Sequence, residues 1–310
     1  MYATSIQTNS CRLPDFIIPG AAKSGTTSLF QILNQHPSIF FPENRKEPFY
    51  FSFGNEKPTY TDQSFVNNLI WKTSDYLDLY ADCPIQMLAG DASTSYMYTA
   101  QDTVAHMEKL YGSALPQVKV IILLRNPVDR AYSHYTYLIR NGLETRSFEE
   151  AISPDGISAW KHKRWGFDYL EYGLYASQIQ IFKRNFPHCK ILLSEDLKNI
   201  DQTISDILSF LELPSIQLNT GINANPSGIP KSRLIVKAMR SNPILKAAVG
   251  LLPLQLKQKA ITRRDYLMAG MLRKEPMSEM TRKSLIQFYK PDVEKLERII
   301  NRDLSHWKNK

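Results

Sequence analysis

The sequence predicts an α/β fold in which a central parallel sheet is covered by helices on both faces. Three observations support this prediction. Short apolar runs alternate along the chain with amphipathic stretches of helical length, as in strand–helix–strand units. The run VKVIILL at 118–124 is rich in β-branched and leucine residues, which is typical of a strand buried on both faces. A loop with two glycines, residues 20–25, separates the first apolar run from a helical stretch.

Each predicted element has a local sequence signature. Apolar runs of strand length cover residues 15–19, 87–91, 118–124 and 189–194. Amphipathic stretches predict helices at residues 26–35, 127–140, 147–152, 175–186, 203–213 and 291–304. Asn126 and Pro127 are residue types that favour the N-cap and the first position of a helix. Ser147 and Glu150 have the spacing of a capping box.

The composition is that of a globular protein. The chain has 310 residues, of which 43% are apolar and 22% charged, and no apolar run is long enough to span a bilayer. The N-terminal stretch lacks a basic region followed by an apolar one, so no secretory signal is expected. Cys11, Cys83 and Cys189 match neither a metal site nor a disulfide framework. We therefore expect a cytoplasmic protein.

The formal net charge of +8 has two interpretations. It indicates either a polyanionic ligand or the ordinary charge that keeps a protein soluble. The sequence has no block of basic residues of the nucleic-acid-binding type, so no nucleic-acid partner is expected. Basic residues without acidic neighbours gather in residues 231–264. Because Pro243 and Pro253 divide this segment into short helices, we expect these helices to form a lid over the binding cleft of the protein; contact with an anionic membrane surface is the alternative.

The loop PGAAKSGTTSLF, residues 19–30, differs from a Walker A phosphate loop in its lysine. A Walker A loop reads G-x-x-x-x-G-K-[ST]. Gly20 and Gly25 have this spacing, but the lysine is Lys23, inside the loop. The amides that open the following helix, together with Lys23, predict an anion site. A magnesium-dependent P-loop nucleotide or metabolite kinase, with Asp91 in the Walker B position, is one candidate.

The pattern K-[ST]-G-T-T-x-L in this loop resembles the 5′-phosphosulfate loop of sulfotransferases that use 3′-phosphoadenylyl sulfate (PAPS). The pattern is most similar to compact bacterial members related to the heparan sulfate-type enzymes. The resemblance implies a P-loop kinase-like fold, PAPS as donor, adenosine 3′,5′-bisphosphate (PAP) as product and no required metal. It assigns the phosphosulfate contacts to Lys23, Ser24, Gly25, Thr26 and Thr27.

Two further motifs resemble the segments that hold the other cofactor phosphate in this family. LLRNPVDRAYSHY, residues 123–135, is similar to R-[DN]-P-x-[DE]-R-[AL]-x-S, and the likeness assigns the 3′-phosphate to Arg125 and Ser133. Arg125 also follows the strongest predicted strand, at the edge where ligands of parallel sheets collect. GIPKSRL, residues 228–234, resembles a late basic loop that closes over the phosphates, with contacts from Lys231, Ser232 and Arg233.

The segment RKEPFYFSF, residues 45–53, resembles the K-E-x-x-[FY]-F segment of the heparan sulfate-type enzymes. In those enzymes a glutamate is the general base, and the resemblance assigns this role to Glu47. Lys23 is expected to neutralise charge on the leaving 5′-phosphate, and Phe49 to wall the acceptor site. Sulfotransferases that act on phenols and steroids use a histidine base instead. The candidates for that alternative are His36, His106 and His134.

The segment GDASTSYMY, residues 90–98, resembles a family segment that lines the acceptor cleft. The likeness places Asp91, Ser93 and Tyr96 near the acceptor. Ala92 stands where the heparan sulfate enzymes carry a lysine, which argues against a heparan-like acceptor. We expect transfer to a hydroxyl or amine of a carbohydrate or small-molecule metabolite.

The resemblance covers most of the chain and predicts one sulfotransferase domain over residues 1–310. Residues 231–310 are expected to form a mainly helical C-terminal extension over the cofactor and acceptor cleft. Three large aromatic residues in the middle of the chain are expected to pack in the protein interior: Trp160, Trp165 and Phe167. Stacking on a ligand ring is the alternative.

Overall fold

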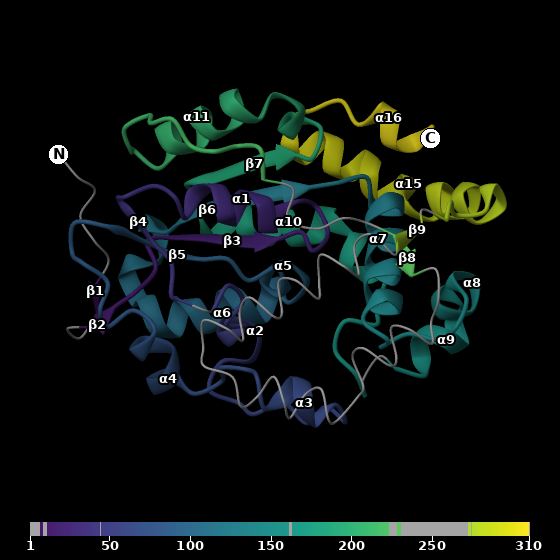
Figure 1. Ribbon diagram of the computed structural model, residues 1–310, viewed down its shortest axis with the longest axis horizontal. Coiled ribbons are helices and arrows are strands. Elements are labelled where there is room, and N and C mark those ends of the chain that lie inside the picture. The colour runs from purple at the N-terminus through teal and green to yellow at the C-terminus, as the bar shows by residue number, and fades with distance from the viewer. Residues whose placement is uncertain are drawn as a thin grey trace.

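Figure 1 shows the computed structural model of the chain, in which a central sheet lies between layers of helices. The structure describes residues 7–8, 11–43, 45–160, 163–222, 228–230, 272–273 and 275–309. The strands are β1 (Gln7–Thr8), β2 (Cys11–Arg12), β3 (Phe16–Gly20), β4 (Ile39–Phe40), β5 (Leu88–Asp91), β6 (Lys119–Leu124), β7 (Cys189–Leu193), β8 (Ile229–Pro230) and β9 (Leu272–Arg273).

The helices vary from single turns to a long helix near the C-terminus. They are α1 (Thr26–Leu33), α2 (Tyr50–Phe53), α3 (Gln63–Val66), α4 (Thr73–Asp78), α5 (Ser95–Tyr98), α6 (Ala100–Tyr111), α7 (Pro127–Arg140), α8 (Phe148–Ile152), α9 (Pro154–Ser158), α10 (Tyr175–Asn185), α11 (Ile200–Phe210), α15 (Glu279–Ile300) and α16 (Ser305–Lys308). Short 3₁₀ turns cover Gly112–Gln117, Glu171–Gly173 and Asp196–Asn199.

The central sheet has five parallel strands in the order β4-β5-β3-β6-β7. The four longer strands match the apolar runs of the sequence, and the fold class is confirmed. The two-residue edge strand β4 was not predicted, because so short a segment has no periodicity to detect. Two antiparallel pairs, β1 with β2 and β8 with β9, lie outside this sheet.

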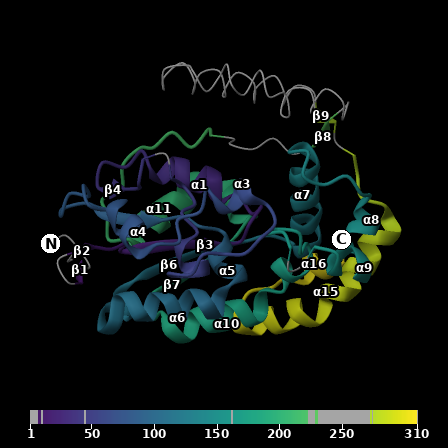
Figure 2. The same cartoon turned by 90° about the horizontal axis from the view of Figure 1, so that it is seen from below.

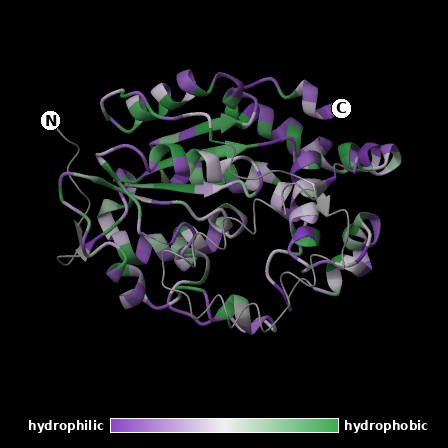
Figure 3. Cartoon of the chain, in the orientation of Figure 1, coloured by the Kyte–Doolittle hydropathy of each residue, from purple (hydrophilic) through white to green (hydrophobic). Residues whose placement is uncertain are grey.

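Helices cover both faces of the sheet, and successive strand residues point to opposite faces. Phe16 and Ile121 pack with Leu29 of α1 and Ile207 of α11 on one face. On the other face, the next residue of β3, Ile17, belongs to the core cluster that includes residues of α6, α10 and α15. Figure 2 shows these two helical layers on either side of the strands. In Figure 3 the central strands are largely hydrophobic, whereas the outer helices carry both kinds of residue.

The helix α7 begins as its sequence predicts. The Asn126 side chain accepts hydrogen bonds from the backbone N–H groups of Val128 (2.9 Å) and Asp129 (3.5 Å), and Pro127 is the first helical residue. The capping box that opens α8 is also present. Both caps satisfy backbone donors that a helix leaves without partners at its N-terminus.

The start predicted for the last long helix is wrong. Pro291 suggested a helix start, but α15 begins at Glu279, with Ser278 as its cap, and continues through the proline. Burial of the apolar face of α15 against α10 and the rest of the core contributes more stability than is lost with the hydrogen bond that a proline cannot make. The described part of the expected C-terminal extension therefore packs against α10 and α7. Residues 231–271, including the predicted lid, lie outside the described residues.

No helix among the described residues is both long and apolar enough to cross a lipid bilayer.

Candidate functional site

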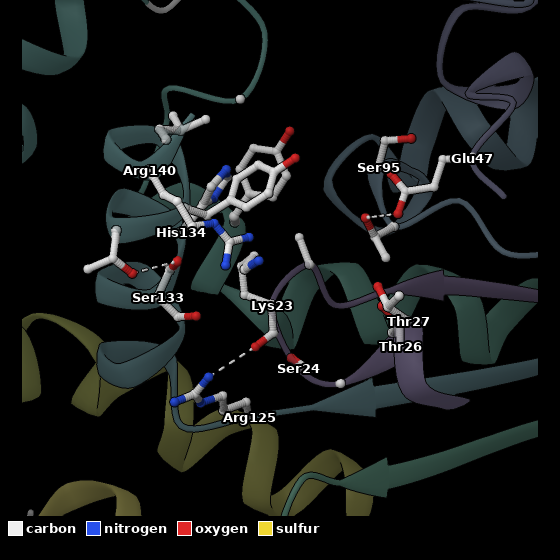
Figure 4. A pocket seen from close by; sticks show the side chains of 18 of the residues that line it. Lys23, Ser24, Thr26, Thr27, Glu47, Ser95, Arg125, Ser133, His134 and Arg140 are labelled. Atoms are coloured by element: carbon white, nitrogen blue, oxygen red, sulfur yellow. Dashed lines mark hydrogen bonds between the residues drawn. The ribbon is translucent and has the colours of Figure 1, made fainter. Parts of the chain in front are cut away.

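A pocket of about 750 Å³ lies at the carboxyl ends of β3 and β6. Its wall includes the loop after β3, residue Arg125 directly after β6, and one side of α7 (Figure 4). In the sheet, β5 lies on one side of β3 and β6 lies on the other. The order in which successive strands are added therefore reverses next to β3, at the carboxyl ends of β3 and β6. Ligands of open α/β sheets bind in the crevice at such a position.

The loop between β3 and α1 has a backbone that presents its amides and its lysine to the pocket. Gly25 has a φ of 106° and Lys23 a φ of 70°, both in the left-handed region. The positive φ at Gly25 favours glycine, and a Cβ atom there would lie 3.0 Å from Leu197 Cδ1, so the leucine side chain would have to shift to make room. The loop leads into α1 at Thr26, and no acidic residue occupies the first turn. This helix N-terminus can therefore accept an anion.

Lys23 lies among cationic neighbours at the centre of the pocket. The pKa of Lys23 is lowered to about 8, chiefly by burial and then by repulsion from Arg140, with smaller contributions from Lys46 and Arg125, while Glu47 opposes the shift. The ammonium group stands 4.1 Å from the ring centroid of Tyr137. A partly desolvated cation among other cations favours an anionic ligand, which would restore its charge.

Arg125 and Ser133 form a second cationic and polar region of the same pocket. Arg125 Nη1 donates to the backbone carbonyl of Lys23 at 3.2 Å, and Tyr175 Oη donates to the carbonyl of Arg125 at 2.9 Å. Within the described residues no carboxylate forms an ion pair with Arg125. Its remaining N–H donors are thus free of internal acidic partners and can contact an anion.

Glu47 lies across the pocket from Arg140 and His134, with Lys23 between them (Figure 4). Its carboxylate pairs with Lys46 at 2.7 Å and accepts a hydrogen bond from Thr94 Oγ1 at 3.3 Å. Its side chain remains about 30% exposed. The ion pair and the pocket position therefore occur together. Among the residues that the structure describes, no hydrogen bond or ion pair engages the second carboxylate oxygen, Oε2.

The histidine candidates are placed less favourably for proton abstraction. His36 Nδ1 accepts from the Ser38 N–H, and Nε2 faces the Pro214 carbonyl at 3.2 Å, so both nitrogens have internal partners. His106 Nδ1 faces the Phe51 carbonyl, and this residue does not line the pocket.

His134 lines the pocket as a neutral hydrogen-bond donor. Its Nδ1 contacts Arg130 Nη1 at 3.2 Å. Because a guanidinium can only donate, Nδ1 must accept and the proton must lie on Nε2. Burial and repulsion from Arg130 and Lys23 hold the His134 pKa well below its ordinary value. His134 thus offers an N–H group, whereas a general base needs an unprotonated nitrogen facing the acceptor.

Asp91, the last residue of β5, accepts hydrogen bonds from three hydroxyl groups in a buried cluster. Tyr76 and Tyr96 donate to Asp91 Oδ2 at 2.9 and 2.7 Å, and Ser93 Oγ donates to Oδ1 at 2.8 Å. The pKa of Asp91 is raised to about 6 by burial, although the hydrogen bonds from Tyr96, Ser93 and Tyr76 act to lower it. The structure thus brings Asp91, Ser93 and Tyr96 together beneath the pocket wall. The neighbouring Thr94 and Ser95 reach the pocket instead.

Most of the residues selected from the sequence converge on this one pocket. Those that line it are Lys23, Ser24, Gly25, Thr26, Thr27, Glu47, Phe49, Arg125 and Ser133. Lys231, Ser232 and Arg233 lie outside the described residues.

Tyr137 and Arg140 also line the pocket, although they were not among the predicted site residues. A signal for both exists in the sequence. They follow Ser133 by four and seven residues in a predicted helix, and this spacing places all three on one helical face. Trp165, expected in the interior, is only half-buried and lines the pocket as well.

Comparisons with known proteins identify the family of the chain. The model of the sulfotransferase domain family matches residues 13–265. The chain is 27% identical over 203 residues to mouse bifunctional heparan sulfate N-deacetylase/N-sulfotransferase 3, covering 63% of this chain and 22% of that protein. It is 27% identical over 187 residues to mouse heparan sulfate glucosamine 3-O-sulfotransferase 3A1, covering 60% of this chain and 41% of the relative. The chain thus spans about a fifth and about two fifths of the length of these curated relatives.

A solved structure extends the likeness to nearly the whole chain. The crystal structure of a sulfotransferase from Alicyclobacillus acidocaldarius superimposes with a TM-score of 0.71 at 28% sequence identity. The match covers 96% of this chain and 99% of that one.

Proposed function

The chain belongs to the sulfotransferase domain family, and on this premise we propose that it transfers the sulfuryl group of PAPS to a hydroxyl or amine of a carbohydrate or small-molecule metabolite. One observation carries the proposal. A single pocket holds two cationic regions, one around Lys23 and one around Arg125, on opposite sides of the loop after β3. PAPS has two phosphate-bearing ends, at the 5′ and 3′ positions, whereas ATP has one.

The residues present fit such a ligand. The loop amides, Thr26 and Thr27 supply donors beside Lys23, and these suit the 5′-phosphosulfate. Arg125 and Ser133 suit the 3′-phosphate, because Arg125 retains donors without an internal carboxylate partner among the described residues.

When bound, PAPS supplies a sulfuryl group activated by a phosphate leaving group. Lys23 is positioned to neutralise the charge that develops on that phosphate. Glu47 accepts the proton of the attacking acceptor, and Thr94 orients its carboxylate. The Nε2–H of His134 gives a fixed donor for a sulfuryl or acceptor oxygen. The separate roles of Glu47 as base and His134 as donor are consistent with their positions, since the two residues lie on opposite sides of Lys23.

The magnesium-dependent kinase has weaker support. Asp91, the candidate Walker B carboxylate, accepts three hydroxyl hydrogen bonds in the core and does not line the pocket. It is therefore not positioned to hold a metal ion beside the loop.

Calorimetry of Arg125→Ala tests the proposal. A charge-assisted phosphate contact is worth about 1.5–3 kcal/mol, so PAP binding should weaken about ten- to a hundredfold, and 5′-AMP binding should change little. Arg184→Ala, at an exposed position of α10, controls for the change in net charge. Equal losses for PAP and AMP would contradict the 3′-phosphate assignment. Tighter binding of Mg-ATP than of PAP would favour the kinase.

A further inference from the structure

One wall of the pocket is apolar and aromatic, and it starts beside the proposed base. Phe49 follows Glu47 by two residues and contacts Phe65 at a ring-centroid distance of 5.7 Å. Phe65 in turn lies parallel to Trp165, with 6.1 Å between centroids and 11° between planes. All three line the pocket and are only half-buried. They form a continuous surface from the base outwards, and we call these three residues the aromatic wall.

The facing side of the pocket is also apolar at its mouth. Tyr137 of α7 and Leu143, just beyond that helix, line the pocket and are each 39% exposed. Large apolar side chains that stay open to solvent around a cavity mark a surface that a ligand covers. Here the exposed groups lie on both sides of the same opening, so a single bound molecule can cover them together.

The charges in this part of the pocket do not complement a polyanion. Lys46 is paired with Glu47 at 2.7 Å, and the Arg140 guanidinium lies 5.5 Å from the ring centroid of Tyr137. Lys23 and Arg125 are taken up by the proposed cofactor sites. Glu47 adds a negative charge at the point where the acceptor must react. Among the described residues, a chain bearing several sulfates or carboxylates would thus meet repulsion from Glu47 at the reacting end, offset by Lys46 and Arg140, which already contact Glu47 and Tyr137.

We propose that the acceptor is an uncharged, ring-bearing small-molecule alcohol that stacks on the aromatic wall, and not an anionic glycan. This inference rests on the proposed sulfuryl transfer and names the acceptor class of that same site. The hydroxyl would lie at Glu47, and the ring system would extend over Phe49 towards Phe65 and Trp165. Aromatic faces select for ring shape and apolar area, with little demand for charge.

The test uses 2-naphthol as the apolar probe and an N-sulfated heparosan oligosaccharide as the anionic one. Calorimetry measures binding of each to the enzyme–PAP complex, and a transfer assay with PAPS measures KM and kcat. We expect 2-naphthol to bind and to be sulfated. Trp165→Ala should raise its KM about tenfold while PAP affinity stays at the wild-type value, and Trp165→Phe should restore most of the loss.

Further variants keep the result interpretable. Phe65→Ala provides a second truncation of the wall, and PAP affinity reports whether each variant is folded. Trp160→Ala is the matched control, because Trp160 packs against Phe167 outside the pocket lining. Its KM for 2-naphthol should not change.

Three results would overturn the acceptor assignment while the proposed function stands. They are sulfation of the oligosaccharide without sulfation of 2-naphthol, tight PAP binding with no binding of 2-naphthol, and a KM that neither truncation of the wall changes. Failure of the proposed function looks different, because PAP itself would then bind no more tightly than Mg-ATP.

Discussion

Glu47 and Lys23 act on different reactants in the proposed reaction, so substitutions of the two residues should affect turnover and cofactor binding differently. Glu47→Gln keeps the shape of the side chain and removes the base. Turnover with PAPS should fall by about 10²–10⁴, the usual contribution of a general base. PAP affinity should stay near wild type, because no cofactor contact is assigned to this carboxylate. Steady-state kinetics and calorimetry measure the two quantities separately.

Lys46→Met is the control for Glu47→Gln. It breaks the same 2.7 Å ion pair but leaves the carboxylate and its Thr94 contact in place. Turnover should therefore fall much less than in Glu47→Gln. A Glu47→Gln enzyme with wild-type turnover would remove Glu47 from the mechanism.

Lys23 should couple cofactor binding to pH. Its pKa of about 8 lies below the ordinary 10.5, because burial and then Arg140 disfavour the charged form. A bound phosphate favours that form and raises the pKa. Above pH 8 the free enzyme has lost the proton that binding requires, so PAP affinity should fall as pH rises from about 8 towards 10. Calorimetry at pH 9 in buffers of different ionisation enthalpy should detect proton uptake on binding.

Lys23→Met separates this effect from other titrating groups. The variant should bind PAP weakly at every pH and take up no proton at this site. Undiminished proton uptake in Lys23→Met would assign the pH dependence to another group.

At the scale of elements, the sequence was most informative where a local rule applies. Strand β6 and helix α7 follow the predicted bounds closely, because a continuous apolar run and an Asn-Pro start are local signals. Helix α15 was mispredicted because its passage through Pro291 depends on packing against distant elements. Gly25 and Lys23 of the loop after β3 could be predicted from their spacing, since loop and helix are contiguous in sequence.

The cap of α7 gives a prediction at this scale. Asn126→Ala removes the side chain that accepts from the N–H groups of Val128 and Asp129. Loss of such a cap costs about 1 kcal/mol, and the free energy of unfolding, measured in urea, should fall by that amount.

Asn126→Asp provides the contrast. It retains an acceptor and adds a negative charge at a helix N-terminus, so stability should be kept. That charge lies beside Arg125, so PAP affinity should decrease. If Asn126→Ala proves as stable as the wild type, the cap does not stabilise the helix.

At the scale of the whole molecule, the sequence did not indicate which side of a segment faces the pocket. Asp91, Ser93 and Tyr96 were selected as acceptor residues, yet the fold turns them into the core and presents Thr94 and Ser95 instead. The aromatic wall was predicted only in part: Phe49 was expected to wall the acceptor site, whereas Trp165 was expected in the interior and Phe65 was not singled out. Its residues come from segments about a hundred positions apart, and only the tertiary fold joins them.

The buried Asp91 cluster makes the stability of the molecule depend on pH. Its folded-state pKa of about 6 lies above the ordinary 3.8, because burial disfavours the carboxylate. The folded state therefore holds the proton more tightly than the unfolded state. The resulting stabilisation is complete below about pH 4 and is lost as pH rises through 6. A shift of about two pKa units corresponds to roughly 3 kcal/mol, as an upper bound.

Asp91→Asn removes this titration while keeping the size of the side chain. The amide changes the hydrogen bonds with Tyr76, Ser93 and Tyr96 by an amount that does not depend on pH. The difference in unfolding free energy between variant and wild type should therefore shift in favour of the variant, by about 2–3 kcal/mol, between pH 4 and 7. Urea titrations at several pH values measure this difference. Other acids, such as Glu144 with its lowered pKa, titrate in both proteins and cancel. A difference that stays constant across this range would mean that Asp91 does not change its protonation there.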